Sequence, residues 1–216
     1  MISTYKPISV ISGDIINSTK LTTEQFEQLL TRIKEVQHLI TKGSLSNVHS
    51  IERGDEFQTV VYDIENALRY TIIYRLAIKA LGKQFDSRIS FAIASNADLR
   101  ESVSESMGEA FVLSGRALKK LKNERLVFNS DRIELSANFD LLFKYLDRQL
   151  TELTSRQCQV MLPMLKTNDS LSIKELSKKL DVADATVSKS LKASGWPLIS
   201  ELNQRFINQV LGLKNV

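Results

Sequence analysis

Residues 53–57 read Arg53-Gly54-Asp55-Glu56-Phe57, and this stretch decides how the rest of the chain is interpreted. An apolar-leaning run from Leu45 to Ile51 precedes it, and a second run from Phe57 to Tyr62 follows it. A Gly-Asp pair between two such runs predicts the tip of a β-hairpin. The acids at this tip would stand at the end of a sheet, where a cation can reach them. An ordinary solvated turn is the alternative, because Gly and Asp are common turn residues.

Strand and helix patterns alternate on both sides of this hairpin. Ile8 to Ile11 is a short β-rich run, and it places Asp14 at the carboxyl end of the first strand. Thr22 and Gln25 have the spacing of a capping box, which begins a helix. The further elements expected are a helix with apolar positions from Phe26 to Ile40, a helix that Asp63 caps and that reaches Ala80, and a strand from Arg88 to Ser95. The order strand, helix, hairpin, helix, strand predicts an α+β fold with a ferredoxin-like sheet.

The middle of the chain completes this first domain and leads to a second one. Residues 97–106 are polar and predict a loop, and a short basic helix is expected from Leu113 to Leu121. Arg125–Phe128 and Arg132–Leu135 predict a closing hairpin. Leucines four residues apart predict a connector helix. The expected boundaries are a ferredoxin-like sheet domain at 1–137, a connector helix at 138–152 and an all-helical domain at 153–216.

The last third of the chain has the spacing of a helix-turn-helix. Capping boxes begin two of its helices, at Thr154 and Gln157 and at Ser172 and Glu175. The turn Asp181-Val182-Ala183 follows the second of these helices, and Asp184 is expected to cap the next one. A short helix, a three-residue turn and a further helix are the units with which such domains place a recognition helix in the major groove.

The helix after this turn carries a polar surface. Val187 and Leu191 form its apolar stripe, and four polar residues lie away from that stripe: Thr186, Ser188, Lys189 and Lys192. Hydroxyls and amines of this kind contact base edges and phosphates. We therefore predict DNA binding by these residues, and a small helical bundle without a ligand is the alternative.

The composition is that of an ordinary soluble globular protein of 216 residues, with 43% hydrophobic and 25% charged residues. No apolar run approaches the roughly 20 residues of a membrane span, so no membrane partner is expected. Cys158 is the single cysteine, which excludes an intrachain disulfide and fits a cytoplasmic location. Residues 150–216 hold 9 Lys and Arg against 6 Asp and Glu, whereas residues 1–149 hold 20 against 19. The basic surplus therefore lies mostly in the predicted DNA-binding part.

Three blocks of the sequence resemble a known family of bacterial proteins. They are Ile11-Ser12-Gly13-Asp14-Ile15-Ile16-Asn17-Ser18, Arg53-Gly54-Asp55-Glu56-Phe57-Gln58 and Gly108-Glu109-Ala110-Phe111. Together they resemble the SatD-like family, over most of residues 5–135. Because members of that family often carry a DNA-binding tail, the resemblance agrees with the helix-turn-helix expected at the end of this chain.

The same blocks are similar, more remotely, to the catalytic domains of class III nucleotide cyclases and diguanylate cyclases. In those families an Asp-Ile pair at the end of the first strand and a Gly-Asp pair at the hairpin supply two metal-binding carboxylates. The resemblance places these roles on Asp14 with Ile15 and on Asp55, beside Glu56. It implies a cyclase-like domain that holds Mg²⁺, or Mn²⁺ in its place, through oxygen ligands.

The resemblance also indicates where a nucleotide would lie. The loop Asn17-Ser18-Thr19 offers backbone N–H groups and hydroxyls to phosphates near the start of a helix. Gly108 to Arg116 resembles the cyclase segment that ends in a phosphate-stabilising arginine, and Arg116 falls on that position. A surface charge beside the neighbouring lysines is the alternative for Arg116.

Three positions depart from the cyclase pattern. Val112 stands where cyclases place an asparagine four residues before the arginine. Ile51 stands near their base-selecting lysine or glutamate and cannot read a purine edge by hydrogen bonding. Arg53 replaces the first glycine of the diguanylate cyclase signature. A site that keeps the metal-binding carboxylates but lacks these catalytic and base-reading residues suits nucleotide or metal binding better than cyclisation of a standard purine nucleotide.

These features lead to one hypothesis and two alternatives. We expect a cytoplasmic DNA-binding regulator whose N-terminal domain binds a nucleotide, a divalent metal or both. We also expect a homodimer, because two half-sites about 34 Å apart need two recognition helices. The first alternative is a nucleotide cyclase or related nucleotidyl-transfer enzyme with a DNA-binding tail. The second is a protein-interaction scaffold in which both acids are structural.

Overall fold

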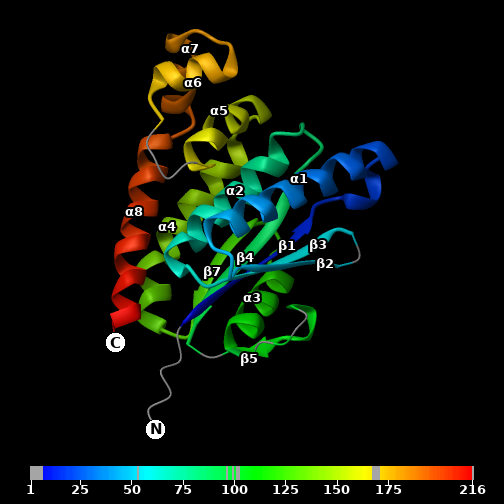
Figure 1. The fold of residues 1–216 in the computed structure, drawn as a ribbon, viewed down its shortest axis with the longest axis vertical. Coiled ribbons are helices and arrows are strands. Elements are labelled where there is room, and N and C mark those ends of the chain that lie inside the picture. Colours follow the sequence, from blue (N-terminus) through cyan, green and yellow to red (C-terminus); the bar gives the residue numbers. More distant parts are fainter. Residues whose placement is uncertain are drawn as a thin grey trace.

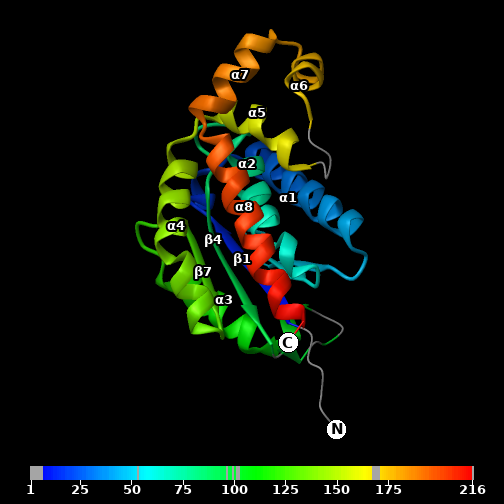
Figure 2. The same ribbon diagram turned by 90° about the vertical axis from the view of Figure 1, so that its left-hand side faces the viewer.

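The computed structural model describes residues 7–52, 54–95, 97–98, 100, 103–166 and 171–215. A mixed β-sheet lies at its centre, with helices on both faces and a group of short helices beyond one end (Figures 1 and 2). Arg53, whose replacement of a glycine is noted above, lies outside the described residues.

The main sheet contains the strands β1 (Ile8–Ile15), β2 (Val48–Glu52), β3 (Glu56–Val61), β4 (Ser87–Ala94) and β7 (Leu126–Ser130). Over the described residues these strands lie in the order β2-β3-β1-β4-β7. Strand β1 is antiparallel to both β3 and β4, and β7 is parallel to β4. The first four strands have the split β-α-β arrangement of a ferredoxin-like sheet, which confirms the predicted α+β fold class.

The helices are α1 (Thr23–Gly43), α2 (Ala67–Lys79), α3 (Glu109–Lys120), α4 (Ile133–Glu152), α5 (Ser155–Lys166), α6 (Ile173–Leu180), α7 (Asp184–Ala193) and α8 (Trp196–Leu211). Single 3₁₀ turns lie at Ser18–Lys20, Ile64–Asn66, Val103–Glu105 and Gly212–Asn215. Two short strands, β5 (Ala97–Asp98) and β6 (Met107–Gly108), pair with each other. No helix in the described part of the chain is long and apolar enough to cross a membrane.

The predicted capping boxes are confirmed. The Thr22 side chain accepts from the Gln25 N–H at 3.2 Å, while the Gln25 side chain accepts from the Thr22 N–H at 3.0 Å. Ser172 and Glu175 make the same reciprocal contacts at the start of α6. Such side chains satisfy N–H groups that the first turn of a helix leaves without a partner. Local sequence therefore fixes where these helices begin.

The predicted closing hairpin at residues 125–135 is wrong. Its first half is β7, which pairs in parallel with β4, and its second half opens α4 at Ile133. Leu135, Phe139 and Phe143 are all buried on one face of α4. A spacing of four residues is typical of one face of a helix. The helix therefore begins earlier, at Ile133, than the connector helix predicted from residue 138.

Two predicted helix caps and one predicted loop are also wrong. Asp63 precedes the 3₁₀ turn at Ile64–Asn66 without a side-chain cap, because its carboxylate accepts from Asn47 and Tyr70. Asp184 is the first residue of α7 rather than its cap, and its carboxylate accepts from the Ser177 hydroxyl. Residues 97–106 are not a plain loop, since they contain β5 and a 3₁₀ turn. The carboxylates of Asp63 and Asp184 thus accept from these side chains, each at least seven positions away, instead of from the backbone N–H groups of the helix that follows.

Alternate positions of β1 face different layers of helices. Ile11 and Ile15 belong to the large core beneath α1 and α2, whereas Ile8 and Val10 belong to a smaller cluster with Ala110 of α3. This is the two-residue period of a strand that is covered on both faces.

The last helix, α8, packs into the core of the sheet. Five phenylalanine rings from the sheet, α4 and α8 contact one another: Phe91, Phe128, Phe139, Phe143 and Phe206. A separate small cluster under α6 and α7 contains Val160, Leu176, Val187 and Leu191. Helix α5 contributes Cys158 and Met161 to the large core but Val160 to the small one. The domain boundaries predicted from the sequence stay a prediction, and helices α5 and α8 link the two cores.

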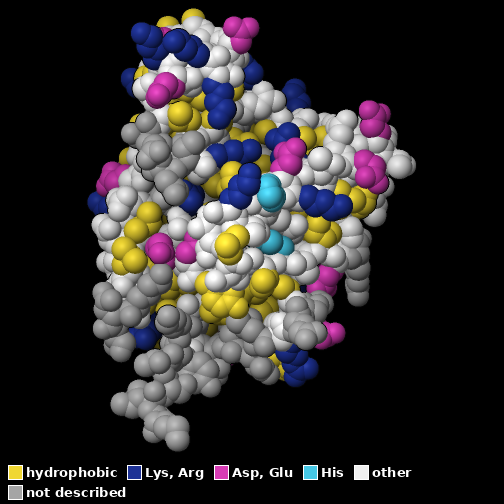
Figure 3. Space-filling view, in the orientation of Figure 1, with side chains coloured by type: hydrophobic (Ala, Val, Ile, Leu, Met, Phe, Trp, Pro, Cys, Tyr) yellow, Lys and Arg dark blue, Asp and Glu magenta, His cyan; other side chains and the backbone are white. Residues whose placement is uncertain are grey.

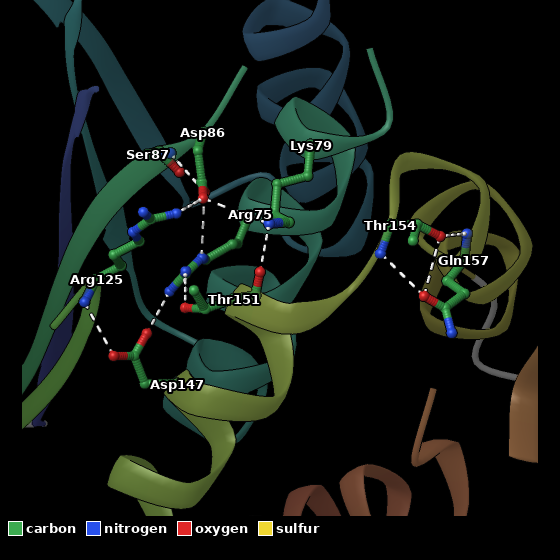
Figure 4. A network of polar contacts seen from close by, with 9 residues as sticks. All are labelled: Arg75, Lys79, Asp86, Ser87, Arg125, Asp147, Thr151, Thr154 and Gln157. Atoms are coloured by element: carbon green, nitrogen blue, oxygen red, sulfur yellow. Dashed lines mark hydrogen bonds and ion pairs between the residues drawn. The ribbon is translucent and has the colours of Figure 1, made fainter. Parts of the chain in front are cut away.

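Buried charges hold α4 against α2 and the sheet (Figure 4). Arg75 of α2 is fully buried; it donates to Asp147 of α4 at 2.6 Å and to the Thr151 hydroxyl at 2.7 Å. Asp86, just before β4, faces Arg75 at 3.5 Å and also contacts Arg125. Because each charge has an opposite partner, the cost of removing these groups from water is offset within the protein.

The same group of residues leads to the C-terminal helices α5 to α8. Lys79 contacts Asp86 at 3.4 Å and donates to the Thr151 carbonyl at 3.0 Å, near the end of α4. Helix α5 begins a few residues further on, and Gln159 donates to the Ala80 carbonyl at 3.0 Å. Helix α5, the first of the C-terminal helices, is thus joined to the C-terminal end of α2 by this hydrogen bond.

Candidate functional site

Helices α6 and α7 are joined by a turn that sets their relative orientation. Asp181 adopts the left-handed conformation, with a φ of 51°, and this allows the chain to reverse after α6 without a glycine. The Val182 N–H donates to the Ser177 carbonyl at 3.1 Å, and the Ser177 hydroxyl donates to Asp184 of α7. Val187 is fully buried against α6. The local geometry is that of a compact helix pair with one helix presented outward.

The exposed surface of α7 contains the residues predicted to bind DNA. Thr186, Ser188, Lys189 and Lys192 are all exposed, while Val187 and Leu191 are buried. Residues 173–193 hold five lysines against three acids. Lys and Arg side chains gather over α6 and α7 at the top of Figure 3. This surface offers amines and hydroxyls on the outer side of a short, well-supported helix.

The second candidate site lies on the α3 face of the main sheet, at one end of its strands. Strand register places Glu52, Glu56, Asp14 and Arg88 directly opposite one another on β2, β3, β1 and β4. Residues paired in this way share a face of the sheet. The Arg88 guanidinium donates to both carboxylate oxygens of Asp14, in one contact at 3.0 Å. The result is a row of three acids that ends at an ion pair.

A pocket of about 300 Å³ opens over this row and is closed on one side by α3. Gly115 and Lys119 of α3 line it together with Asp14, Glu56 and Arg88. The Ser114 hydroxyl of α3 donates to the Ser12 hydroxyl of β1 at 2.7 Å, which fixes the helix over the strand. The pocket therefore presents both signs of charge within a rigid frame.

Asp55 has a different set of contacts from Asp14. Its carboxylate accepts from the Ser18 hydroxyl at 2.7 Å, and its carbonyl accepts from the Ile15 N–H at 3.1 Å. Ile15 is buried in the core beneath the helices, on the opposite face from Asp14. The acid that shares a face with Asp14 is thus Glu56, and the structure brings Asp55 to the Asn17-Ser18-Thr19 loop instead.

The two carboxylates of the predicted Mg²⁺ site each have another partner in this structure. Arg88 engages both oxygens of Asp14, and Asp55 is held by Ser18. Among the described residues, no group of three or more His, Cys, Asp or Glu side chains could hold a metal ion. Magnesium needs several oxygen ligands around one point. The metal site at Asp14, Ile15, Asp55 and Glu56 stays a prediction.

The structure places Arg116 outside the pocket wall. It is exposed on α3, and Val112 one turn earlier is 38% exposed. The basic residues that do line the pocket are Arg88 and Lys119. Sequence reasoning missed both. Arg88 could be assigned to the pocket only once the register between β1 and β4 was known, because it lies 74 positions after Asp14 in the sequence.

The Asn17-Ser18-Thr19 loop forms the start of a 3₁₀ turn after β1. Asn17 takes the left-handed conformation, with a φ of 55°, and its carbonyl accepts from the Lys20 N–H at 2.9 Å. Asn17 and Thr19 are exposed, and Ser18 is partly buried against Asp55. The predicted contact of this loop with phosphates stays a prediction.

Comparison with known proteins gives only structural similarities. No family model and no curated protein sequence matches this chain. A structure of the guanylyl cyclase Cya2 is similar over 56% of this chain and 74% of that chain, with 14% identity and a TM-score of 0.43. A bacterial light-regulated adenylyl cyclase covers the same shares with 16% identity and a TM-score of 0.39. A further structure described in the same words has 16% identity, covers 56% and 42%, and has a TM-score of 0.41. None of these similarities says what this chain binds or catalyses.

Proposed function

We propose that this protein is a DNA-binding regulator in which α7 contacts DNA and the pocket over β1 binds a small ligand. The observation that carries the proposal is the α6–turn–α7 unit, with its buried Val187 and its exposed Lys189 and Lys192. Helix-turn-helix proteins insert the second helix of such a unit into the major groove. Lysines at its outer surface neutralise phosphates, and hydroxyls such as that of Ser188 reach base edges.

The charges of the pocket favour a ligand that carries both signs. Lys119 attracts an anionic group, whereas Glu52 and Glu56 attract a cationic one. A nucleotide accompanied by a divalent cation has both kinds of group, and it is the ligand class expected from the sequence. A screen of thermal stability with nucleoside phosphates and Mg²⁺ tests this part. A ligand present at about 100 times its Kd stabilises the folded state by about 2.7 kcal/mol.

A continuous set of contacts leads from the pocket toward the DNA-binding helices. Arg88 lies two residues beyond Asp86, and the Asp86 carbonyl accepts from the Ile16 N–H at 3.0 Å. The Asp86 carboxylate holds Arg75 and Lys79, which in turn contact Thr151 at the end of α4. In the proposed regulator, a ligand that competes with Asp14 for Arg88 would act through these buried charges on the end of α4, and from there on α5, which begins at Ser155.

A mobility-shift assay with fragments of genomic DNA tests the DNA-binding function. We expect the wild-type protein to shift a subset of fragments, and the double variant Lys189→Ala with Lys192→Ala to lose most of this binding. A variant with Lys83→Ala and Lys122→Ala is the matched control, since both lysines are exposed and lie outside α6 and α7. If the wild-type protein shifts no fragment at low salt, the proposed function fails.

An enzyme is the second candidate, and one observation favours it. The pocket lies between Asp14 and α3, the helix that also carries Arg116. Incubation with each nucleoside triphosphate and Mg²⁺ or Mn²⁺ tests for a nucleotide cyclase or nucleotidyl-transfer activity. Product that forms with the wild-type protein and disappears in Asp14→Ala would establish the enzyme and displace the regulator as the primary function.

A further inference from the structure

The outer surface of α4 and α8 carries an apolar groove. The two helices run side by side in opposite directions on the same flank of the molecule (Figures 1 and 2). Their inner faces pack on the sheet through Phe143 and Phe206. Between their outer faces lies a groove of about 380 Å³, with the buried side chains of Leu146 and Ile199 among its lining residues.

The rim of this groove is made of large apolar side chains. Leu198 is 73% exposed, Tyr145 is 66% exposed and Leu142 is 38% exposed. Leu142 and Tyr145 are three residues apart on α4, and Leu198 and Leu202 are four residues apart on α8, so each pair lies on one side of its helix. Each helix thus has a second apolar stripe besides the one that faces the sheet. Two antiparallel helices with facing outer stripes are half of a four-helix bundle.

The charges around the groove alternate in sign along each helix. Glu201 and Arg205 pair at 2.9 Å on α8, and Arg148 and Glu152 pair at 3.0 Å on α4. A surface for nucleic acid or for an anionic membrane would carry one sign of charge. Paired charges of both signs suit a second copy of the same surface, because a two-fold axis that crosses a helix between the two charges of a pair brings each charge near its opposite in the other copy.

We propose that a second copy of this chain docks on the groove, so that α4 and α8 of the two copies form a four-helix bundle around a two-fold axis. Only Ser194 and Gly195 separate α7 from α8. The bundle would therefore set the distance between the two recognition helices, as a DNA site with two half-sites requires. That last point rests on the proposed function, whereas the docking of two copies does not.

Sedimentation equilibrium of the full chain, without DNA, tests the proposal. We expect the wild-type protein to be a dimer at micromolar concentration. Leu198→Glu and Tyr145→Lys each place a charge in the centre of the bundle and should raise the dimer Kd at least about 30-fold. Leu45→Glu is the matched control: Leu45 is 88% exposed in the segment between α1 and β2, and this variant should remain a dimer.

Two results would overturn the proposal. One is a wild-type protein that stays monomeric at concentrations up to about 100 μM. The other is a wild-type dimer whose Kd is unchanged in both charged variants. Circular dichroism shows whether each variant is folded. If a charged variant fails to fold, Leu198→Ala replaces it in the test. This variant makes a milder change, and it should still weaken the dimer. Dimerisation without DNA binding would leave this inference standing while the proposed function failed, so the two outcomes are distinguishable.

Discussion

Two groups of charged residues in this protein differ in how they are used. The first group, around Arg75, Asp86 and Asp147, is buried where α2, α4 and the sheet meet, and its members are partners of one another (Figure 4). The second group, which includes Lys189 and Lys192, is exposed on α7. Charges satisfied within the chain act on stability, whereas charges left at the surface are available to a ligand. Substitutions in the two groups should therefore change different measurements.

The largest effect is expected from breaking the buried group. Arg75→Met removes the buried cation that pairs with Asp147 and also faces Asp86, and it should lower the free energy of unfolding by about 3–5 kcal/mol. Urea denaturation measures this change. Arg148→Ala is the matched control, because Arg148 is 77% exposed and pairs with Glu152 at the surface; its effect should stay within about 0.5 kcal/mol. If both variants lowered the free energy of unfolding by the same amount, buried and exposed ion pairs would contribute equally to stability, which contradicts this account.

A partly buried histidine extends this comparison to the pH dependence of stability. His49 lies between the hydroxyls of Thr41 and Thr59, at 2.9 and 3.0 Å, and burial lowers its pKa from 6.5 to about 4. The folded state keeps the ring neutral, while the unfolded state takes up a proton below pH 6.5. Stability should therefore be complete above pH 6.5 and fall toward pH 4, by at most about 1.4 kcal/mol per pH unit from this residue.

His49→Gln should flatten this part of the pH profile, measured by urea denaturation at several pH values. His38→Gln is its control, since His38 is exposed on α1. A profile that is unchanged by His49→Gln would mean that other groups cause the loss of stability at acidic pH.

A smaller effect is expected at the joint between α6 and α7. Ser177 is buried and donates to the Asp184 carboxylate, so Ser177→Ala should lower the free energy of unfolding by about 1–2 kcal/mol. Ser188→Ala, on the exposed side of α7, should leave stability unchanged and weaken DNA binding instead. Loss of stability in Ser188→Ala rather than in Ser177→Ala would reverse the assignment of the two faces.

The smallest stability effect is expected at a helix cap. Ser172→Ala removes the acceptor for the Glu175 N–H and should cost about 1 kcal/mol. The hydrogen bonds from Ser172 to Glu175 also hold the pKa of that carboxyl below its usual value. An NMR titration of Glu175 should accordingly show its pKa rise in this variant, and an unmoved pKa would contradict the role of the cap.

Sequence alone predicted the features that depend on near neighbours. The β2–β3 hairpin around Gly54 and the capping boxes at Thr22 and Ser172 are confirmed, because turn and cap chemistry acts over a few residues. The parallel pairing of β7 was missed, since no local pattern separates the second strand of a hairpin from the first turn of a helix in a run as short as 132–135.

The contacts of the pocket could not be read from local spacing. Asp14 lies opposite Glu56 and Arg88 because of strand register, and a shift of one residue would have brought Asp55 to its face instead. Lys119 lines the pocket because Ser114 fixes α3 over β1. These relations join residues far apart in the chain and become visible only in the folded protein.

The salt dependence of DNA affinity, measured by fluorescence anisotropy, tests the central claim most directly. For a bound fragment, the logarithm of the affinity should fall linearly with the logarithm of the salt concentration. If Lys189 and Lys192 each neutralise one phosphate, the double alanine variant should show a slope smaller in magnitude by about 1.8. The variant with Lys83→Ala and Lys122→Ala should keep the wild-type slope. A wild-type protein without salt-dependent binding, or identical slopes in all three proteins, would contradict the account.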